Sequence, residues 1–308
     1  MKFRGLASFV FLLSFGLVQA QVTVEVTLPQ EQFLQGESLP VAVRIENRSG
    51  QTLRLGEGQD WLTFSLEGRD GEVVPKLEDV PVEGEFTLES SQVAVKHVDL
   101  APYFTLSGPG HFGIVAAVKI RDWGRQLESR PKYFDIVDGS KLWEQVVGVP
   151  ESGDKAGSAP EVRRYILQQA NYIKGQLRLY LRVTDAYGRA IRVFNIGPML
   201  SFSRPEPQVD KLSHLHVLYQ KGPGSYSYTI FDLDGKILTH QTYEYLATRP
   251  RLKLDDDGNV TVTGGSRRVA ANDIPAPTPQ ELDQATKLAD NPPTPPPAQT
   301  NSAKAKKK

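Results

Sequence analysis

The stretch Val22-Thr23-Val24-Glu25-Val26-Thr27-Leu28 places an apolar residue at every second position and a polar residue between them. Because successive side chains of a strand point to opposite faces of the sheet, this alternation predicts a half-buried β-strand. The same alternation returns in Val41-Ala42-Val43-Arg44-Ile45-Glu46, and Asn47-Arg48-Ser49-Gly50 then predicts a turn. The start of this region therefore indicates β-structure.

Further strand patterns continue to residue 137. Residues 61–66 and 73–74 flank Arg69-Asp70-Gly71, and an Asp-Gly pair in that place is typical of a hairpin. Residues 112–120 alternate over a longer stretch, and residues 133–136 suggest a last short strand. About seven short strands with regular turns predict a β-sandwich over residues 21–137.

This region resembles the immunoglobulin-like domains of bacterial exported proteins. The resemblance rests on Val43-Arg44-Ile45-Glu46-Asn47 before a Ser-Gly turn, and on Gly108-Pro109-Gly110-His111-Phe112 at the start of the penultimate strand. It implies the architecture of an immunoglobulin-like sandwich. The Cys-Trp-Cys core of antibody domains is absent from the sequence, so the resemblance implies no receptor role.

Residues 1–20 have the composition of a signal peptide. Lys2 and Arg4 supply the positive charge, residues 6–18 are apolar, and Val18-Gln19-Ala20 offers small residues for cleavage before Gln21. The alternative is a retained anchor, and the polar, strand-like sequence that follows at once argues against it. The sequence predicts export to the periplasm or the extracellular space, with no transmembrane segment after cleavage.

Composition excludes some classes of partner. The chain has 36 basic and 36 acidic residues, so no net charge attracts it to nucleic acid. It has no cysteine, so core burial alone holds the exported domains together. A cysteine-free exported chain favours a bacterial envelope.

The second half of the chain is predicted to be a separate domain. Residues 138–160 contain the polar segment Glu151-Ser152-Gly153-Asp154 and are predicted to be a linker. Residues 161–270 show alternating patterns, as in residues 177–183 and 226–232, and predict a second all-β domain. Ser158-Ala159-Pro160-Glu161 also matches a helix-capping box. We prefer a strand there, because the following apolar residues are rich in Tyr and Ile.

Two segments of this second domain echo each other. Residues 183–191 resemble residues 230–237 at an offset of about 46 residues, which suits one four-stranded blade per unit. The C-terminal part therefore resembles β-propeller blades. The second domain has room for about two such units, whereas a closed propeller needs at least about four blades. The chain therefore either stacks two blades or self-associates through the second domain. Chance similarity between hairpins is the open alternative.

Residues 271–308 form a tail rich in proline and lysine, which its composition predicts to be disordered. Its lysine tip leads to the hypothesis of a weak tether to anionic envelope material.

Several candidate sites have an ordinary structural alternative. Gly108-Pro109-Gly110-His111-Phe112-Gly113 matches the dinucleotide pattern G-x-G-x-x-G, but a strand is predicted where the site needs a helix. The acidic turns before Gly235 and Gly258 lack the ligands of a calcium loop, so both are interpreted as hairpin turns.

His214 and His216 are the metal-site candidates of the sequence. They lie two residues apart in a predicted strand, so their rings share a face and offer half of a zinc site. No third ligand is evident, although His240 or Glu244 would serve if folding brings either of them close. We interpret the pair as surface or cross-strand histidines and predict no bound metal and no cofactor.

The sequence contains no assembled catalytic motif. We therefore expect a non-enzymatic, exported binding or structural module whose partner is another protein or an envelope component. Two alternatives remain at this point: a metal-dependent or hydrolytic protein that uses His214 and His216, and a sandwich of the proteinase-inhibitor type.

Overall fold

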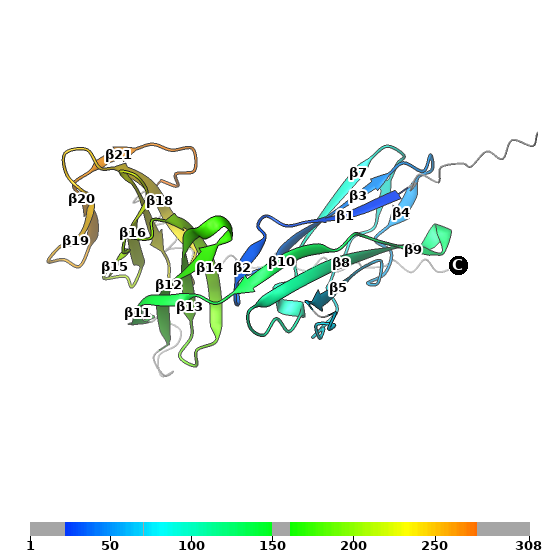
Figure 1. Cartoon of the computed structure of the whole chain (residues 1–308), viewed down its shortest axis with the longest axis horizontal. Helices are drawn as coiled ribbons and strands as arrows, with labels where there is room; N and C mark the ends of the chain where they lie inside the picture. The colour runs from blue at the N-terminus through cyan, green and yellow to red at the C-terminus, as the bar shows by residue number, and fades with distance from the viewer. Residues whose placement is uncertain (1–21, 70, 150–160, 276–308) are drawn as a thin grey trace, which may run out of the picture. The chain divides into compact units, whose positions relative to one another are not determined.

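The computed structural model describes residues 22–69, 71–149 and 161–275, and these residues form an all-β protein (Figure 1). The helical content of this part is three short 3-10 turns, η1 Ala101–Tyr103, η2 Arg121–Trp123 and η3 Ile173–Gly175. No helix in the described part is long and apolar enough to cross a membrane. The all-β class predicted from the sequence is thus confirmed.

The described chain divides into two compact units. Unit 1 takes the chain up to Leu142 together with Gln168–Tyr180 and Arg192–Asn195. Unit 2 takes Trp143–Leu167, Leu181–Ile191 and the chain from Ile196 onward.

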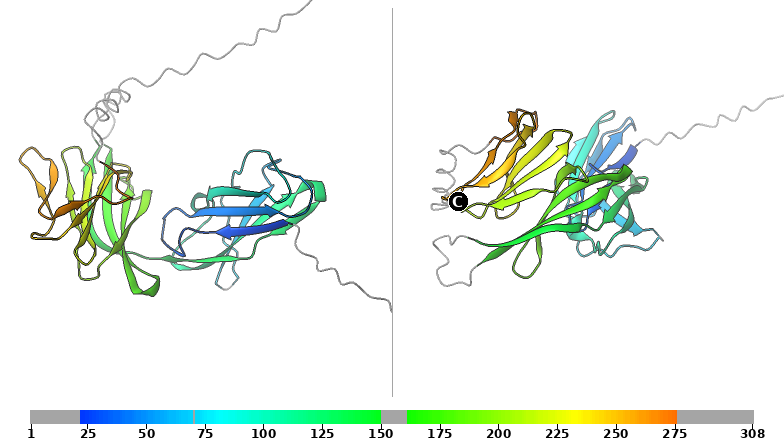
Figure 2. Two further views of the ribbon diagram at one scale, coloured as in Figure 1. Left: turned by 90° about the horizontal axis from the view of Figure 1, so that it is seen from above. Right: turned by 60° about the vertical axis from the view of Figure 1, so that its left-hand side comes forward.

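Unit 1 is built on two sheets, which can be followed as layers in Figure 2. The first has the order β1-β3-β7, with β1 Val22–Thr27, β3 Pro40–Asn47 and β7 Val93–Asp99. The second has the order β2-β10-β8-β5, and β9 pairs with β8. Its strands are β2 Gln32–Leu34, β5 Leu62–Gly68, β8 Gly110–Ile120, β9 Arg125–Glu128 and β10 Lys132–Val137. A small pair, β4 Leu53–Leu55 and β6 Phe86–Leu88, also belongs to this unit.

The alternating side chains of the two sheets form one apolar core. Val43 and Ile45 from β3 meet Leu66 from β5 and Ile114 from β8, and all four are fully buried. Trp61 lies just before β5 at 1% exposure and donates its Nε1–H to the carbonyl of Val82 at 2.7 Å. This core explains why a chain without disulfides forms a stable sandwich.

Unit 2 contains most of a long series of antiparallel strands. One sheet has the order β11-β12-β13-β14 and another the order β15-β16-β17-β18-β21, while β19 pairs with β20. The bounds of the first sheet are β11 Ser140–Gly148, β12 Val162–Tyr172, β13 Gln176–Thr184 and β14 Ala190–Met199. The bounds of the others are β15 Glu206–Val209, β16 Leu215–Gly222, β17 Ser225–Phe231, β18 Ile237–Glu244, β19 Arg251–Leu254, β20 Val260–Thr263 and β21 Ser266–Arg268.

The predicted linker differs from the structure. Ser140–Gly148 is strand β11, which joins a sheet with β12, and Val147 on it is buried. Val147 has apolar surface to bury that a polar linker lacks, whereas Leu142 and Val146 stay exposed. Residues 150–160 lie outside the described part, as do the predicted signal peptide and all but the first five residues of the predicted tail.

The predicted domain boundary at residue 161 also differs from the observed units. Leu34 of β2 packs in one buried cluster of unit 1 with Ala170, Tyr180 and Val193. Such contacts between distant parts of the chain leave no local pattern in the sequence. By contrast, the choice of strand over helix after residue 161 is confirmed by β12.

Candidate functional site

His214 and His216 lie in a closed network of polar side chains in unit 2. His216 on β16 is 4% exposed, its Nδ1 lies 2.7 Å from the hydroxyl of Tyr228, and its Nε2 lies 3.2 Å from Asp210 Oδ2. The Nδ1 of His214 lies 3.3 Å from the same carboxylate oxygen. Both nitrogens of the buried ring are therefore engaged by protein partners.

Electrostatics in this network favour a fixed structural role. Burial alone would raise the pKa of Asp210, but hydrogen bonds from His214 and His216 outweigh it and hold that pKa well below its usual range. Burial raises the pKa of the Tyr228 hydroxyl. Asp210 stays ionised and Tyr228 stays protonated, so neither group titrates near neutral pH.

No group of three or more His, Cys, Asp or Glu side chains in the described residues is placed to hold a metal ion. The further ligands considered from the sequence, His240 and Glu244, lie on β18 and contact other groups. His240 faces Ser227, and Glu244 pairs with Arg268.

Ser227, His240 and Asp273 have the residue types of a catalytic triad. The Ser227 Oγ lies 2.9 Å from His240 Nε2, while the His240 Nδ1 faces the Asn272 carbonyl at 3.2 Å and Asp273 Oδ1 at 3.8 Å. Ser227 is fully buried on the interior strand β17, so a substrate has no access to its hydroxyl. The contact joins β17 to β18 and to the segment that follows β21.

The glycine-rich segment at residues 108–113 is a turn that leads into a strand. Gly108 has a φ of 89°, and β8 begins at Gly110. The backbone N–H groups of a strand do not converge on a phosphate as those of a helix N-terminus do, so this segment lacks the geometry of a dinucleotide site.

The acidic turns of unit 2 are hairpin turns, as predicted. Four turns begin with Asp185, Asp210, Asp232 and Asp255, and each aspartate Oδ1 accepts the N–H four residues ahead. The fourth residue of each turn has a positive φ: Gly188, Ser213, Gly235 and Gly258. The turns recur about every 23 residues, so the two segments that echo each other in the sequence are alternate members of this series. In each turn, the aspartate Oδ1 is thus engaged by the backbone of its own turn.

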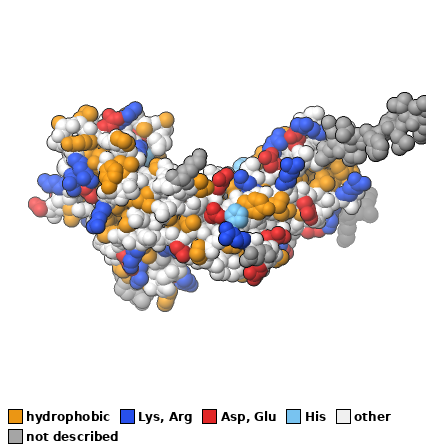
Figure 3. Space-filling view, viewed as in Figure 1, with side chains coloured by type: hydrophobic (Ala, Val, Ile, Leu, Met, Phe, Trp, Pro, Cys, Tyr) orange, Lys and Arg blue, Asp and Glu red, His pale blue; other side chains and the backbone are white. Residues whose placement is uncertain are grey.

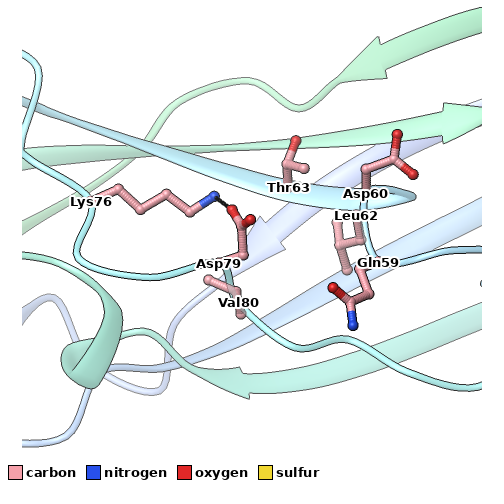
Figure 4. A pocket seen from close by; sticks show the side chains of 7 residues that line it. All are labelled: Gln59, Asp60, Leu62, Thr63, Lys76, Asp79 and Val80. Carbon is pink, nitrogen blue, oxygen red and sulfur yellow. Dashed lines mark hydrogen bonds and ion pairs between the residues drawn. The ribbon is translucent and has the colours of Figure 1, made fainter.

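A small pocket in unit 1, shown in Figure 4, is lined by Gln59, Asp60, Lys76 and Asp79 among others. Its volume is about 70 Å³, and the Lys76 ammonium pairs with the Asp79 carboxylate. This space holds at most a few waters and no organic ligand.

The free edge of β1 has a defined set of backbone groups. Asn47 on β3 donates its N–H to the carbonyl of Gln92 at 3.0 Å, so its backbone points toward β7. The N–H and C=O groups of successive residues in a strand point to opposite edges. Val22 lies opposite Asn47, so the backbone of Val22 does not hydrogen-bond to β3.

It follows that Thr23, Glu25 and Thr27 form the ladder with β3. The N–H and C=O groups of Val22, Val24 and Val26 point away from β3, and no described residue pairs with them. This leaves three donors and three acceptors in a row.

A groove runs beside this free edge. It has a volume of about 630 Å³ and lies between β1 and the residues of β9 and the start of β10. Val24, Leu127 and Pro131 supply apolar surface, and Glu128 and Lys132 lie among the polar lining residues. Figure 3 shows hydrophobic side chains interspersed with charged ones on this side of unit 1. The groove and the open edge together form the candidate site.

The other long edges of the two sheets carry protective features that β1 lacks. The edge strand β7 carries Lys96 and His97. The β5 edge is covered near its end, where Val74 donates its N–H to the Leu66 carbonyl at 2.9 Å. Strand β1 has no proline, no lysine and no bulge, and it pairs with β3 in an unbroken register.

The sequence predicts β1 as a strand but does not identify its edge as a site. An alternating Val-Thr pattern shows which face is buried, whereas the partner on each edge depends on the order of strands in the sheet. The lack of proline and lysine in residues 22–27 is a signal that would have marked the strand as an unprotected edge.

No protein-family model matches this chain, and no curated protein matches it. Among solved structures, the sporulation control protein Spo0M from Bacillus subtilis is similar over 58% of this chain and 90% of its own, at 10% sequence identity and a TM-score of 0.29. A likeness at this level carries no argument about function.

Proposed function

We propose that the protein is an exported, non-catalytic binding module of a bacterial envelope or the extracellular space, and that it binds an extended polypeptide along β1. The row of unpaired backbone groups on Val22, Val24 and Val26 beside the groove carries this proposal. Export rests on the signal-like sequence of residues 1–20.

The chemistry of the edge selects an extended peptide. A strand laid beside β1 satisfies the outward N–H and C=O groups with backbone hydrogen bonds, whatever its sequence. Its alternate side chains enter the groove over Val24 and Leu127, so apolar residues at every second position bind best. Backbone bonds thus supply affinity and the groove supplies selectivity.

The architecture of unit 1 supports an immunoglobulin-like assignment within this proposal. In that fold, one sheet holds the first, second, fourth and fifth strands, and the other holds the third, sixth and seventh. With β2 taken as a continuation of the first strand, β1-β3-β7 supplies the first, second and fifth strands and β5, β8 and β10 supply the third, sixth and seventh. The sheet β1-β3-β7 has no fourth strand. The buried Trp61 just before β5 is consistent with the core tryptophan of that fold.

A terminally blocked peptide probe with alternating Thr and Val tests the proposal. We expect the acetylated, amidated peptide Lys-Thr-Val-Thr-Val-Thr-Val-Thr-Lys to bind with a dissociation constant in the micromolar range, as measured by fluorescence anisotropy. The protein variant Val24→Pro lacks one outward N–H and should lose most of this binding. The matched variant Val24→Ala keeps the N–H and should retain it.

The same peptide with N-methyl groups on its valines is the second control. Its valine nitrogens cannot donate hydrogen bonds to β1, so it should not compete with the unmethylated peptide. Equal binding of the methylated peptide, or no binding of either peptide at about millimolar concentration, overturns the proposal.

A further inference from the structure

We infer that β1 also docks on β1 of a second copy of this chain, in an antiparallel register with Val24 opposite the partner subunit's Val24. This inference rests on the proposed strand-accepting edge and names one occupant for it. The result would be a continuous six-stranded sheet across a two-fold axis, formed from the β1-β3-β7 sheets of both copies.

The alternation of backbone groups along β1 determines the register of the two strands. In an antiparallel pair, residues that exchange hydrogen bonds lie directly opposite each other, and opposite side chains share a face. The outward groups belong to Val22, Val24 and Val26, so a register centred on Val24 pairs each of these valines with a valine of the partner subunit. A register centred on Thr23 or on Glu25 leaves one of the three valines without a valine opposite it.

Charge disfavours one of these shifted registers. Centring on Glu25 places that carboxylate opposite the partner subunit's Glu25, on the exposed face. Like charges directly opposite each other destabilise a sheet. In the register centred on Val24, Glu25 faces the partner subunit's Thr23 instead, so charge is compatible with the register that pairs the three valines.

The groove provides space for the second strand. The inward valines of β1 line it, and Val22 and Val26 are already buried within unit 1, while Val24 is only half-buried. A second β1 would place its own valines on the same face, next to Leu127 and Pro131. The apolar surface left at the margin of the core is then covered from both copies.

Cysteine cross-linking gives a direct test, because the chain has no cysteine of its own. The protein is expressed from the full-length chain, and mass spectrometry establishes its N-terminus. In the proposed register, Val24→Cys places two thiols directly opposite each other, within the Cα separation of about 4.4–6.8 Å that a disulfide needs. We expect Val24→Cys to form a disulfide dimer under mild oxidation.

The matched control is Thr27→Cys, an exposed position at the end of β1. In this register its thiols lie far apart, so it should cross-link at least about tenfold more slowly. Sedimentation equilibrium of the unmodified protein should show a concentration-dependent dimer that Val24→Pro removes and Val24→Ala retains.

The outcomes separate this inference from the proposed function. A protein that stays monomeric at all concentrations, or that cross-links equally at both positions, overturns the second-copy inference. If the same preparation still binds the alternating peptide, strand addition stands and only its occupant is wrong. If the protein neither dimerises nor binds the peptide, the second-copy inference and the proposed function are both wrong.

Discussion

His216 illustrates how a residue with metal-ligand chemistry is used for structure. Its two ring nitrogens lie against Tyr228 and Asp210, and the ring is almost completely buried. A buried imidazole with both nitrogens engaged orders its neighbours, because each of those neighbours would otherwise be buried with an unpaired polar atom.

Replacing His216 with Leu should lower the free energy of unfolding by about 2–4 kcal/mol, since two buried partners lose a hydrogen bond. His214→Leu is the matched control. The ring of His214 is 21% exposed and, among the described residues, contacts the Asp210 carboxylate, so we expect a loss of about 1 kcal/mol. Chemical denaturation measures both values. A larger loss for His214→Leu than for His216→Leu would contradict this role.

His240 should make stability depend on pH below neutrality. Burial, with help from Lys221, lowers its pKa below the ordinary value of 6.5. The unfolded state then binds a proton more readily than the folded state, so the stabilisation is complete above about pH 6.5 and is lost as the pH falls below it. Denaturant unfolding from pH 8 to pH 5 should show this loss, and His240→Asn should reduce it. If His240→Asn has the same pH dependence as the unmodified protein, His240 is not the cause of this loss of stability.

At the residue scale, the sequence predicts which histidines share a strand face but not what they contact. Asp210 is close to His214 in the chain, whereas Tyr228 comes from the neighbouring strand. The contact of His216 with Tyr228 needs the register of β16 on β17, in which Val217 lies opposite Thr229. Register depends on packing over the whole sheet, so this part of the network was not predictable from the sequence.

At the scale of elements, β1 has two chemically different edges, and proline distinguishes them. Thr23→Pro removes an N–H from the ladder with β3 and should lower the free energy of unfolding by about 3 kcal/mol. Val24→Pro removes an outward N–H and should lower the free energy of unfolding by clearly less, mainly because the valine side chain is lost. Thermal and denaturant unfolding of the two variants provides the comparison. Equal losses would mean that the assignment of the edges is wrong.

The aspartate turns make a second prediction for elements. The Oδ1 of Asp232 accepts the N–H groups of Asp234 and Lys236, at 2.9 and 2.7 Å. Asp232→Ala leaves both N–H groups without that acceptor and should lower the free energy of unfolding by about 1–2 kcal/mol. Asp232→Asn keeps an acceptor oxygen and should lower it by less. Chemical denaturation of the two variants tests this. If the two losses were equal, the carboxylate oxygen would not organise the turn.

Elements with a local signal were predictable, and those without one were not. Strand β1 and the turn at Gly235 follow from alternation and from Asp-Gly chemistry. Strand β11 was missed because its pattern, with Trp143 and Val147 among polar residues, has no clean alternation. Its place beside β12 depends on residues that come later in the chain.

At the scale of the whole molecule, limited proteolysis tests the corrected division of the chain. Residues 151–158 are polar and small, so we expect the first internal cut there and not within β11. Because β11 and β12 share a sheet and Val149 donates its N–H to the Glu161 carbonyl at 2.8 Å, the two fragments should stay together in native buffer. Size-exclusion chromatography before and after denaturation measures this. Fragments that separate in native buffer would contradict the pairing of β11 with β12.

The sequence predicts the class of the whole molecule and two β-rich regions, but not the units themselves. Gln168–Tyr180 belongs to unit 1 although it follows the predicted linker. Tyr180 is fully buried in the cluster with Leu34, a contact over more than a hundred residues of chain. No local pattern encodes such a pairing.

Amide hydrogen exchange along β1 tests the central claim most directly, because it reads each backbone N–H separately. For the protein alone at low concentration, we predict protected amides at Glu25 and Thr27 and rapid exchange at Val24 and Val26. Saturating alternating peptide should slow exchange at Val24 and Val26 and leave Glu25 and Thr27 unchanged. If Val24 and Val26 are already protected at high dilution, or stay unprotected with saturating peptide, β1 is not a strand-accepting edge.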